Sequence, residues 1–135
     1  MATYIWIHLE YKDSKTKKYQ YVGEFCGDKI YGVFGILAGA RSSIEPIYPP
    51  RGLPEDVCRD IKFEYDTFEE DAHTPSYLYS HELRECLDAV DKIFRQCYKE
   101  EYSPEGLKNY EYIYKCMRVF DDAGEPARMV FWFDN

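Results

Sequence analysis

Side chains able to bind a small anion are concentrated in three segments between residues 31 and 78. The first segment ends on an arginine, the second is proline-rich and presents another arginine, and the third combines a histidine with two hydroxyls. A guanidinium group offers a planar fork of donors to phosphate or carboxylate, and hydroxyls add short hydrogen bonds. The sequence therefore predicts an anion pocket formed by Arg41, Arg51, His73, Thr74 and Ser76.

Tyrosine is abundant, with 14 copies among 135 residues, and aromatic residues reach 18%. A tyrosine ring packs against apolar groups while its hydroxyl stays in contact with water or a ligand. We therefore expect Tyr31, Tyr77 or Trp132 to stack on the base of a bound nucleotide. The alternative is that these rings belong to an aromatic core, because an amphipathic ring serves either purpose.

Each predicted binding residue also has a more ordinary alternative. Arg41 and Arg51 can each pair with a nearby carboxylate or cap the carboxyl end of a helix. A lone histidine such as His73 often stabilises a loop through both ring nitrogens. The sequence leaves these alternatives open.

No reaction signature stands out in the sequence. It has no zinc-type motif in which His-x-Glu is followed by Pro-Cys-x-x-Cys, no P-loop and no Gly-x-Ser-x-Gly motif. The three histidines, His8, His73 and His81, lie on different predicted elements, so they do not predict a metal site. We therefore predict no catalytic residues, no metal and no cofactor.

The chain is acidic, with a net charge of −8 and a sequence pI near 4.9. A protein that binds duplex DNA or RNA usually has a basic face, so we do not expect a duplex nucleic acid as partner. A small anionic ligand stays compatible because a pocket is governed by local charge. Acidic residues are concentrated between Glu55 and Asp71, which predicts a solvated helix face or, alternatively, a surface that binds a partner protein.

The five cysteines are scattered, their number is odd, and they show no Cys-x-x-Cys spacing. Together with the lack of a signal-peptide pattern, this indicates reduced thiols in a cytoplasm. No apolar run approaches the ~20 residues that cross a membrane. We expect a cytoplasmic protein with no membrane partner.

Hydrophobic alternation predicts three strands. Residues 4–9 and 19–25 alternate with the period of a strand and flank a polar turn at 13–18, which is typical of an antiparallel hairpin. Residues 128–133 are apolar almost throughout, as in a central strand. We predict an α+β fold in a single domain of residues 1–135, with an antiparallel sheet (N-terminal hairpin plus C-terminal strand) and helices packed mainly on one face.

Four helices are predicted. The first covers residues 30–40, where three glycines indicate close approach of a ligand or, alternatively, tight packing. The second begins at Pro54, the third has Ser80 as its N-cap, and the fourth begins at Ser103. The third carries the strongest apolar stripe, and residues 67–75 are predicted to form a loop.

Four sequence blocks follow one another in a fixed order. The first reads Tyr-x-x-Phe-x-x-Leu-Ala-x-x-Arg at residues 31–41, and the second reads Arg-Gly-Leu-Pro-x-Asp-Val at 51–57. A His-Ser-x-Ser-like block follows at His73, with Thr74 in place of a serine, and the chain ends on Val-Phe-Trp-Phe-Asp-Asn. In these blocks the chain resembles a family of small phage and prophage proteins, most of which have no assigned function.

Small phage proteins of this size include inhibitors of bacterial immunity that enclose signalling nucleotides. By analogy, the resemblance implies an anti-defence protein of the host cytoplasm that sequesters a small anionic nucleotide without chemistry. The ligand would be a cyclic dinucleotide or a cyclic ADP-ribose derivative. The alternatives are a phosphodiesterase with His73 as general base, and an acidic module that inhibits a host factor.

The first predicted strand carries large side chains on both faces. Because large exposed apolar patches usually mark an interface, we expect a homo-oligomer, most simply a symmetric dimer. The residues that would form this interface are Tyr4, Trp6, Tyr19, Tyr21 and Phe25. The alternative is that helices of the same chain cover this face.

Overall fold

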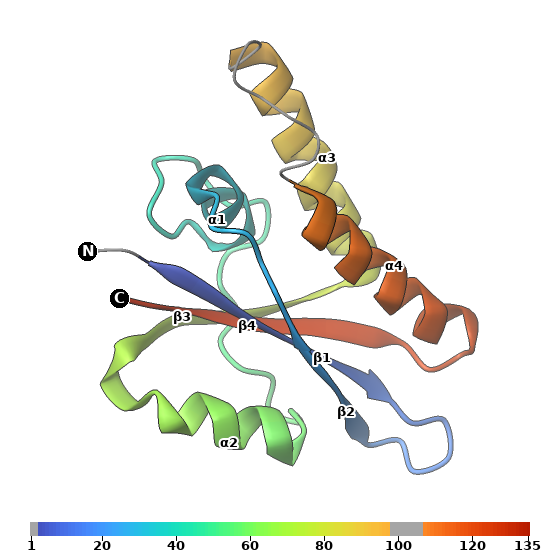
Figure 1. Ribbon diagram of the computed structural model, residues 1–135. Coiled ribbons are helices and arrows are strands. Elements are labelled where there is room, and N and C mark those ends of the chain that lie inside the picture. Colours follow the sequence, from blue (N-terminus) through green and yellow to red (C-terminus); the bar gives the residue numbers. More distant parts are fainter. Residues whose placement is uncertain (1–2, 98–106) are drawn as a thin grey trace.

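Four antiparallel strands form one sheet in the order β2-β1-β4-β3 (Figure 1). The computed structural model describes residues 3–97 and 107–135. The strands are β1 (Tyr4–Lys12), β2 (Tyr19–Phe25), β3 (Ala72–Tyr79) and β4 (Ala127–Asp134). This arrangement confirms the N-terminal hairpin and the central position of the C-terminal strand.

Strand β3 corrects one prediction, because residues 67–75 were expected to form a loop. The strand pairs with β4, but its register shifts between His73 and Ser76. Thr74 lies within this shift at φ 54°, a left-handed conformation that is rare for a β-branched residue. The irregularity and Pro75 break the alternation by which a strand is recognised in a sequence.

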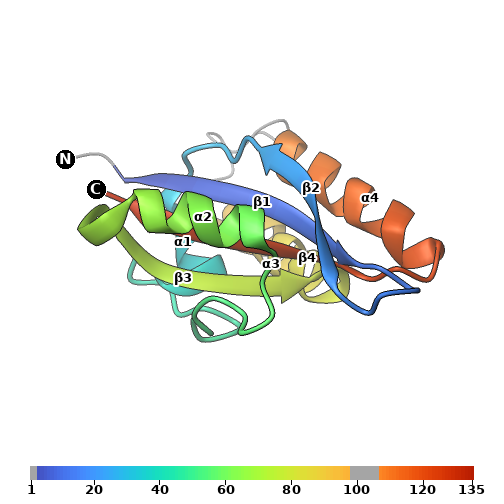
Figure 2. The same ribbon diagram turned by 90° about the horizontal axis from the view of Figure 1, so that it is seen from below.

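Helices cover both faces of the sheet, and most of them lie on the same face (Figures 1 and 2). This confirms the α+β fold with helices mainly on one face. The helices are α1 (Tyr31–Ala38), α2 (Arg59–Thr67), α3 (Ser80–Cys97) and α4 (Lys108–Asp122), and a short 3-10 turn, η1 (Glu69–Asp71), follows α2. Among the helices of the described residues, α2 packs on the opposite face of the sheet from α1, α3 and α4.

The larger core lies between the sheet and helices α1, α3 and α4. Alternate residues of the central strands, such as Leu9 on β1 and Phe131 on β4, are fully buried there. The apolar stripe predicted for the third helix supplies Leu83 and Leu87, and Tyr110 joins them from α4. These contacts exclude water from the whole of this face.

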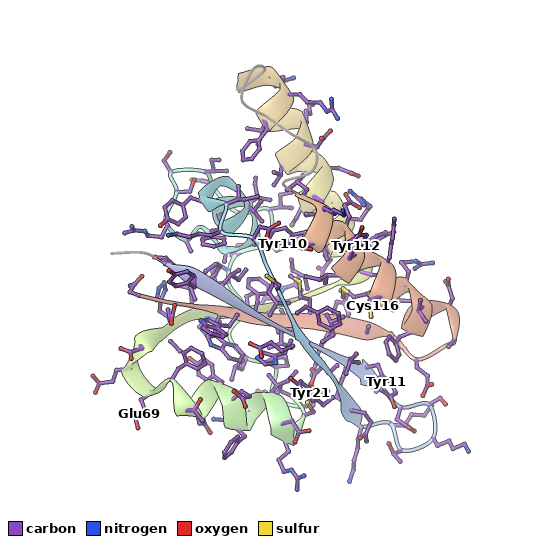
Figure 3. The ribbon with its side chains drawn as sticks, in the orientation of Figure 1. Tyr11, Tyr21, Glu69, Tyr110, Tyr112 and Cys116 are labelled. Atoms are coloured by element: carbon purple, nitrogen blue, oxygen red, sulfur yellow. The ribbon has the colours of Figure 1, made fainter. Side chains whose placement is uncertain are left out.

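A smaller core lies between the sheet and α2. Trp132 on β4 is fully buried here, and its ring stacks on His8 at 5.0 Å between ring centroids. Tyr65 and Phe68 meet the Trp132 ring edge-on from the side of α2. Figure 3 shows Tyr21 on this side of the sheet, and its hydroxyl lies 2.8 Å from His8 Nδ1.

The glycines of α1 pack against other segments of the chain. A Cβ atom on Gly32 would lie 2.3 Å from the ring of Phe94, and one on Gly35 would lie 2.7 Å from Ser42. Larger residues at these positions would push α1 away from α3 and from its own following loop. Tight packing within the chain, the alternative to close approach of a ligand, therefore explains these two glycines.

Two predicted helix starts differ from the structure. Helix α2 begins at Arg59, because residues 54–57 first make a turn in which the Val57 N–H donates to the Pro54 carbonyl. Ser80 is the first residue of α3, and its hydroxyl donates to Asp121. The start predicted at Ser103 lies outside the described residues.

The aromatic set from which an oligomer was predicted is largely covered within one chain. Trp6, Tyr19 and Tyr21 pack against the core under α2, and the edge of the Trp6 ring meets Phe68 at 5.1 Å. Tyr4 stays 52% exposed. This packing removes most of the patch on which the homo-oligomer was argued, and the oligomeric state itself stays a prediction.

The buried His8 ring predicts that acid weakens the fold. Burial lowers the pKa of His8 from 6.5 to about 4. Between these two pH values His8 is protonated in the unfolded chain but neutral in the folded chain. The contribution of neutral His8 to the free energy of unfolding should be fully present above the unfolded pKa. It should be lost, with a fall of about 2 kcal/mol, as the pH drops from 6.5 toward 4. His8→Asn, which still offers a partner to Tyr21, should lose this increment in urea unfolding measured across the window. Equal slopes for both proteins would contradict it.

Candidate functional site

A buried ion pair connects the two central strands on the face that α2 covers. Glu10 on β1 and Arg128 on β4 are register partners, and their side chains are 0% and 3% exposed. The Arg128 Nε–H donates to one Glu10 oxygen, and the other oxygen accepts the Cys58 N–H at 2.8 Å. Because Cys58 immediately precedes α2, the pair also fixes the start of that helix on the sheet.

A second carboxylate reaches Arg128 from outside. Asp56 Oδ1 lies 2.8 Å from Arg128 Nη2, and the Asp56 side chain is 65% exposed. Burial alone would lower the pKa of Arg128, but the Glu10 and Asp56 carboxylates raise it above its ordinary value. Arg128 is therefore a permanent cation with one buried and one exposed partner.

Tyrosine rings and guanidinium groups alternate across this end of the sheet. Arg51 lies 5.0 Å from the centroid of Tyr48 and 5.3 Å from that of Tyr77. Arg128 lies 5.4 Å from Tyr77 and 3.5 Å from Tyr19. We call Tyr48, Arg51, Tyr77, Arg128 and Tyr19 the Tyr–Arg row. Guanidinium groups on aromatic faces gain electrostatic and dispersion energy together.

The Arg51 segment is attached to strand β3. Its backbone N–H donates to the Ser76 hydroxyl at 3.1 Å, and the Gly52 N–H donates to the Pro75 carbonyl at 2.9 Å. The Arg51 guanidinium donates to the Tyr77 carbonyl at 3.1 Å and to both oxygens of Glu82. The proline-rich segment thus has a fixed position beside the sheet.

Glu82 joins this arrangement to the start of α3. Its Oε1 accepts the Tyr79 N–H at 2.9 Å, so the carboxylate caps the helix from its third residue. Burial would raise the pKa of Glu82, but the Arg51 guanidinium and the Tyr79 N–H lower it below its ordinary value. The carboxylate is ionised, and it orients Arg51 as well as the helix.

A groove of about 550 Å³ runs along the Tyr–Arg row, a volume within the range of small-molecule sites. It lies between the sheet and the segment that leads into α2. Two guanidinium groups and two tyrosine rings face it, and carboxylates form part of its rim. Its lining residues are Arg51, Leu53, Pro54, Glu55, Asp56, Tyr77, Tyr79 and Arg128.

Three of the predicted binding residues come together here. Arg51 and Tyr77 line the groove, and Ser76 supports Arg51 from the buried side of β3. Trp132 lies elsewhere: it is fully enclosed by the core under α2, so its ring has no exposed face for a ligand.

His73 and Thr74 lie at the shifted end of β3. His73 Nδ1 is 2.9 Å from the Thr74 hydroxyl, and the His73 ring stacks on Phe133 at 6.0 Å. Phe133 belongs to the larger core, whereas Tyr77 packs against the core under α2. His73 therefore points to the opposite face of the sheet from the groove.

Arg41 and Tyr31 form a separate pair at α1. The Arg41 guanidinium lies 5.4 Å from the Tyr31 ring centroid, and its hydrogen bond to the phenol lowers the pKa of Tyr31. Neither residue lines the groove. The predicted pocket is thus divided among the groove, the shifted end of β3 and this pair.

Sequence reasoning missed Arg128, Tyr79 and Asp56. A signal for Arg128 exists in the sequence, because it is the one charged residue between Ala127 and Phe133. A cation in a strand predicted to be central needs a carboxylate partner. That this partner lies on β1 can be inferred only when the register of the sheet is known.

The described residues hold no group of three or more His, Cys, Asp or Glu side chains suited to a metal ion. None of the helices in the described ranges has the length and apolar character of a membrane span. Burial raises the pKa of Cys58 to about 11 and that of Cys86 to about 12. Both thiols are therefore protonated and poor nucleophiles at neutral pH.

Removing the buried carboxylate should cost far more stability than removing an exposed one. Glu10→Gln keeps an acceptor for Cys58 but leaves Arg128 buried without its main counter-charge, and we expect a loss of roughly 3 kcal/mol. Asp66→Asn breaks the exposed pair with Lys62 and should change stability by less than about 0.5 kcal/mol. Urea unfolding measures both, and similar values would show that the buried pair does not organise this face.

No protein-family model matches this chain, and neither does any curated protein or solved structure. The resemblance to phage proteins therefore stays an expectation from sequence.

Proposed function

We propose that the protein binds a small anionic nucleotide in the groove along the Tyr–Arg row. The observation that carries the proposal is the placement of Arg51 and Arg128 at 5.3 Å and 5.4 Å from the Tyr77 ring centroid, in a groove of about 550 Å³. Two guanidinium groups suit phosphate oxygens, and tyrosine rings suit a base. The expected consequence is sequestration of a signalling nucleotide such as a cyclic dinucleotide or a cyclic ADP-ribose derivative.

Both arginines keep donors for a ligand. A guanidinium has five N–H donors. Hydrogen bonds within the described part of the chain use three of them on Arg51 and two on Arg128. The buried carboxylates Glu82 and Glu10 hold the two groups in place, so orienting them costs little further entropy when a phosphate arrives.

The base would lie against the tyrosine side of the groove. Tyr79 lines the groove, and its ring meets Tyr77 edge-on at 6.2 Å. Tyr77 contacts guanidinium groups of the row, and the Tyr79 ring stacks on His81 at 6.4 Å between ring centroids. Either ring would offer the base its remaining face, which adds Tyr79 to the stacking residue expected from sequence.

The proposed role is binding without chemistry. A phosphodiesterase would need a general base within hydrogen-bond reach of its substrate. His73, the candidate base, belongs to the opposite face of the sheet from the groove. Incubation with a bound nucleotide, heat denaturation and chromatography should return the nucleotide intact, whereas recovery of a cleavage product would favour the enzyme.

Isothermal titration against cyclic dinucleotides and ADP-ribose derivatives tests the proposal. At least one member should bind with a micromolar dissociation constant. Arg51→Lys keeps the positive charge beside Glu82 but loses the planar fork, so we expect at least about tenfold weaker binding. Arg41→Lys makes the same change outside the groove and should leave the affinity unchanged.

Two results would contradict this proposal. One is that no member of the panel binds below the millimolar range. The other is that Arg41→Lys weakens binding as much as Arg51→Lys, which would move the site to the pair at α1.

A second candidate function is supported by the surface of α2. All acidic side chains from Glu55 to Asp71 are exposed, and Phe63 on the same helix is 67% exposed. Figure 3 shows Glu69 at the outer end of this region. An exposed aromatic ring among carboxylates suits a basic surface of a partner protein.

Charge reversal separates the two candidates. The four residues to be reversed, none of which lines the groove, are Asp60, Glu64, Glu69 and Glu70. If the protein blocks a host factor, their reversal should abolish its effect on phage plating on a defended host, while Arg51→Lys has none. The nucleotide proposal predicts the opposite pattern.

A further inference from the structure

We infer that Asp56 is an exchangeable counter-ion that occupies the place of a ligand's anionic group on Arg128. The inference rests on the proposed function and adds a regulating residue to the same groove. Arg128 Nη2 donates to Asp56 at 2.8 Å, and both residues line the groove. An oxyanion entering the groove therefore meets a guanidinium that already holds a carboxylate.

The two carboxylates on Arg128 differ in what their removal would disturb. Glu10 is fully buried and also accepts the Cys58 N–H. If its carboxylate moved away, the buried Arg128 guanidinium would lose its buried counter-charge. Asp56 is 65% exposed, so its carboxylate can leave Arg128 and be hydrated by water at a small cost in free energy. Of these two partners, Asp56 is the one that a ligand can displace.

The backbone beside Asp56 allows this exchange. Asp56 lies in the turn of residues 54–57, which is closed by the Val57 N–H donating to the Pro54 carbonyl at 3.2 Å. The next residue, Cys58, is held to the sheet by its own N–H bond to Glu10. A rotation of the Asp56 side chain thus leaves both the turn and the start of α2 intact.

The charges around the groove determine which ligands bind well. Arg128 with Glu10 and Arg51 with Glu82 are each neutral pairs, and Asp56 makes the local sum negative. A ligand with a single negative charge only replaces Asp56, whereas a ligand with two phosphates also reaches the remaining N–H donors of Arg51, which lies near the same Tyr77 ring. The groove should therefore prefer a diphosphate or bis-phosphate ligand to a single phosphate.

Asp56→Asn tests the inference, with Asp60→Asn as the matched control. Each variant removes one negative charge from an exposed aspartate near the start of α2, but Asp60 neither lines the groove nor contacts Arg128 in the structure. Titration calorimetry with ADP-ribose and inorganic pyrophosphate should show at least about fivefold tighter binding to Asp56→Asn. Asp60→Asn should change affinity by less than about twofold, since its effect is long-range and screened by salt.

The outcomes separate this inference from the proposed function. If the native protein binds a probe but Asp56→Asn binds it no more tightly than Asp60→Asn, the counter-ion role is wrong while the binding function stands. If neither the native protein nor Asp56→Asn binds any probe, both are wrong. A thermal melt of Asp56→Asn is the last test. We expect a cooperative unfolding transition at a temperature near that of the native protein. Loss of folding would show that Asp56 is a structural residue and would overturn the inference.

Discussion

The buried pair of Glu10 and Arg128 is the constraint on which the face under α2 depends. A cation in the central strand of a sheet must be paired, because an uncompensated charge in this environment is strongly destabilising. Its partner on β1 fixes the register of the two central strands and, through the Cys58 N–H, the start of α2. The other end of the same helix covers Trp132, so one ion pair and one aromatic cluster together close this side of the sheet.

The two faces of the sheet therefore have different characters. Three helices seal one face with apolar side chains, whereas the other combines a small core with charged and aromatic groups that reach solvent. The Tyr–Arg row lies where this small core ends. Its arginines attach the proline-rich segment to the sheet, and the same attachment holds their guanidinium groups beside the groove. The structural role of Arg51 and Arg128 and the binding role that we propose thus fall on the same side chains.

Sequence predicted the elements whose patterns are regular and the site residues whose types are distinctive. The hairpin, β4 and α3 were found because their apolar positions repeat with the period of a strand or a helix. Strand β3 was missed because Thr74 and the register shift interrupt that period. Arg51, Ser76 and Tyr77, predicted from residue type, lie at or beside the groove, and their role in binding stays a prediction. Glu10 and Arg128 are 118 positions apart, so their pairing appears only once the sheet is formed.

Arginine side-chain NMR during titration with ADP-ribose is the most direct measurement of the proposed binding mode, because each guanidinium reports its own contacts. We expect the Nε–H resonances of Arg51 and Arg128 to shift and saturate together as the ligand is added. Those of Arg41, beside Tyr31, and of Arg84, which pairs with Glu111, should stay in place. Saturating shifts confined to Arg41, or no residue-specific shift at millimolar ligand, would contradict a nucleotide site along the Tyr–Arg row.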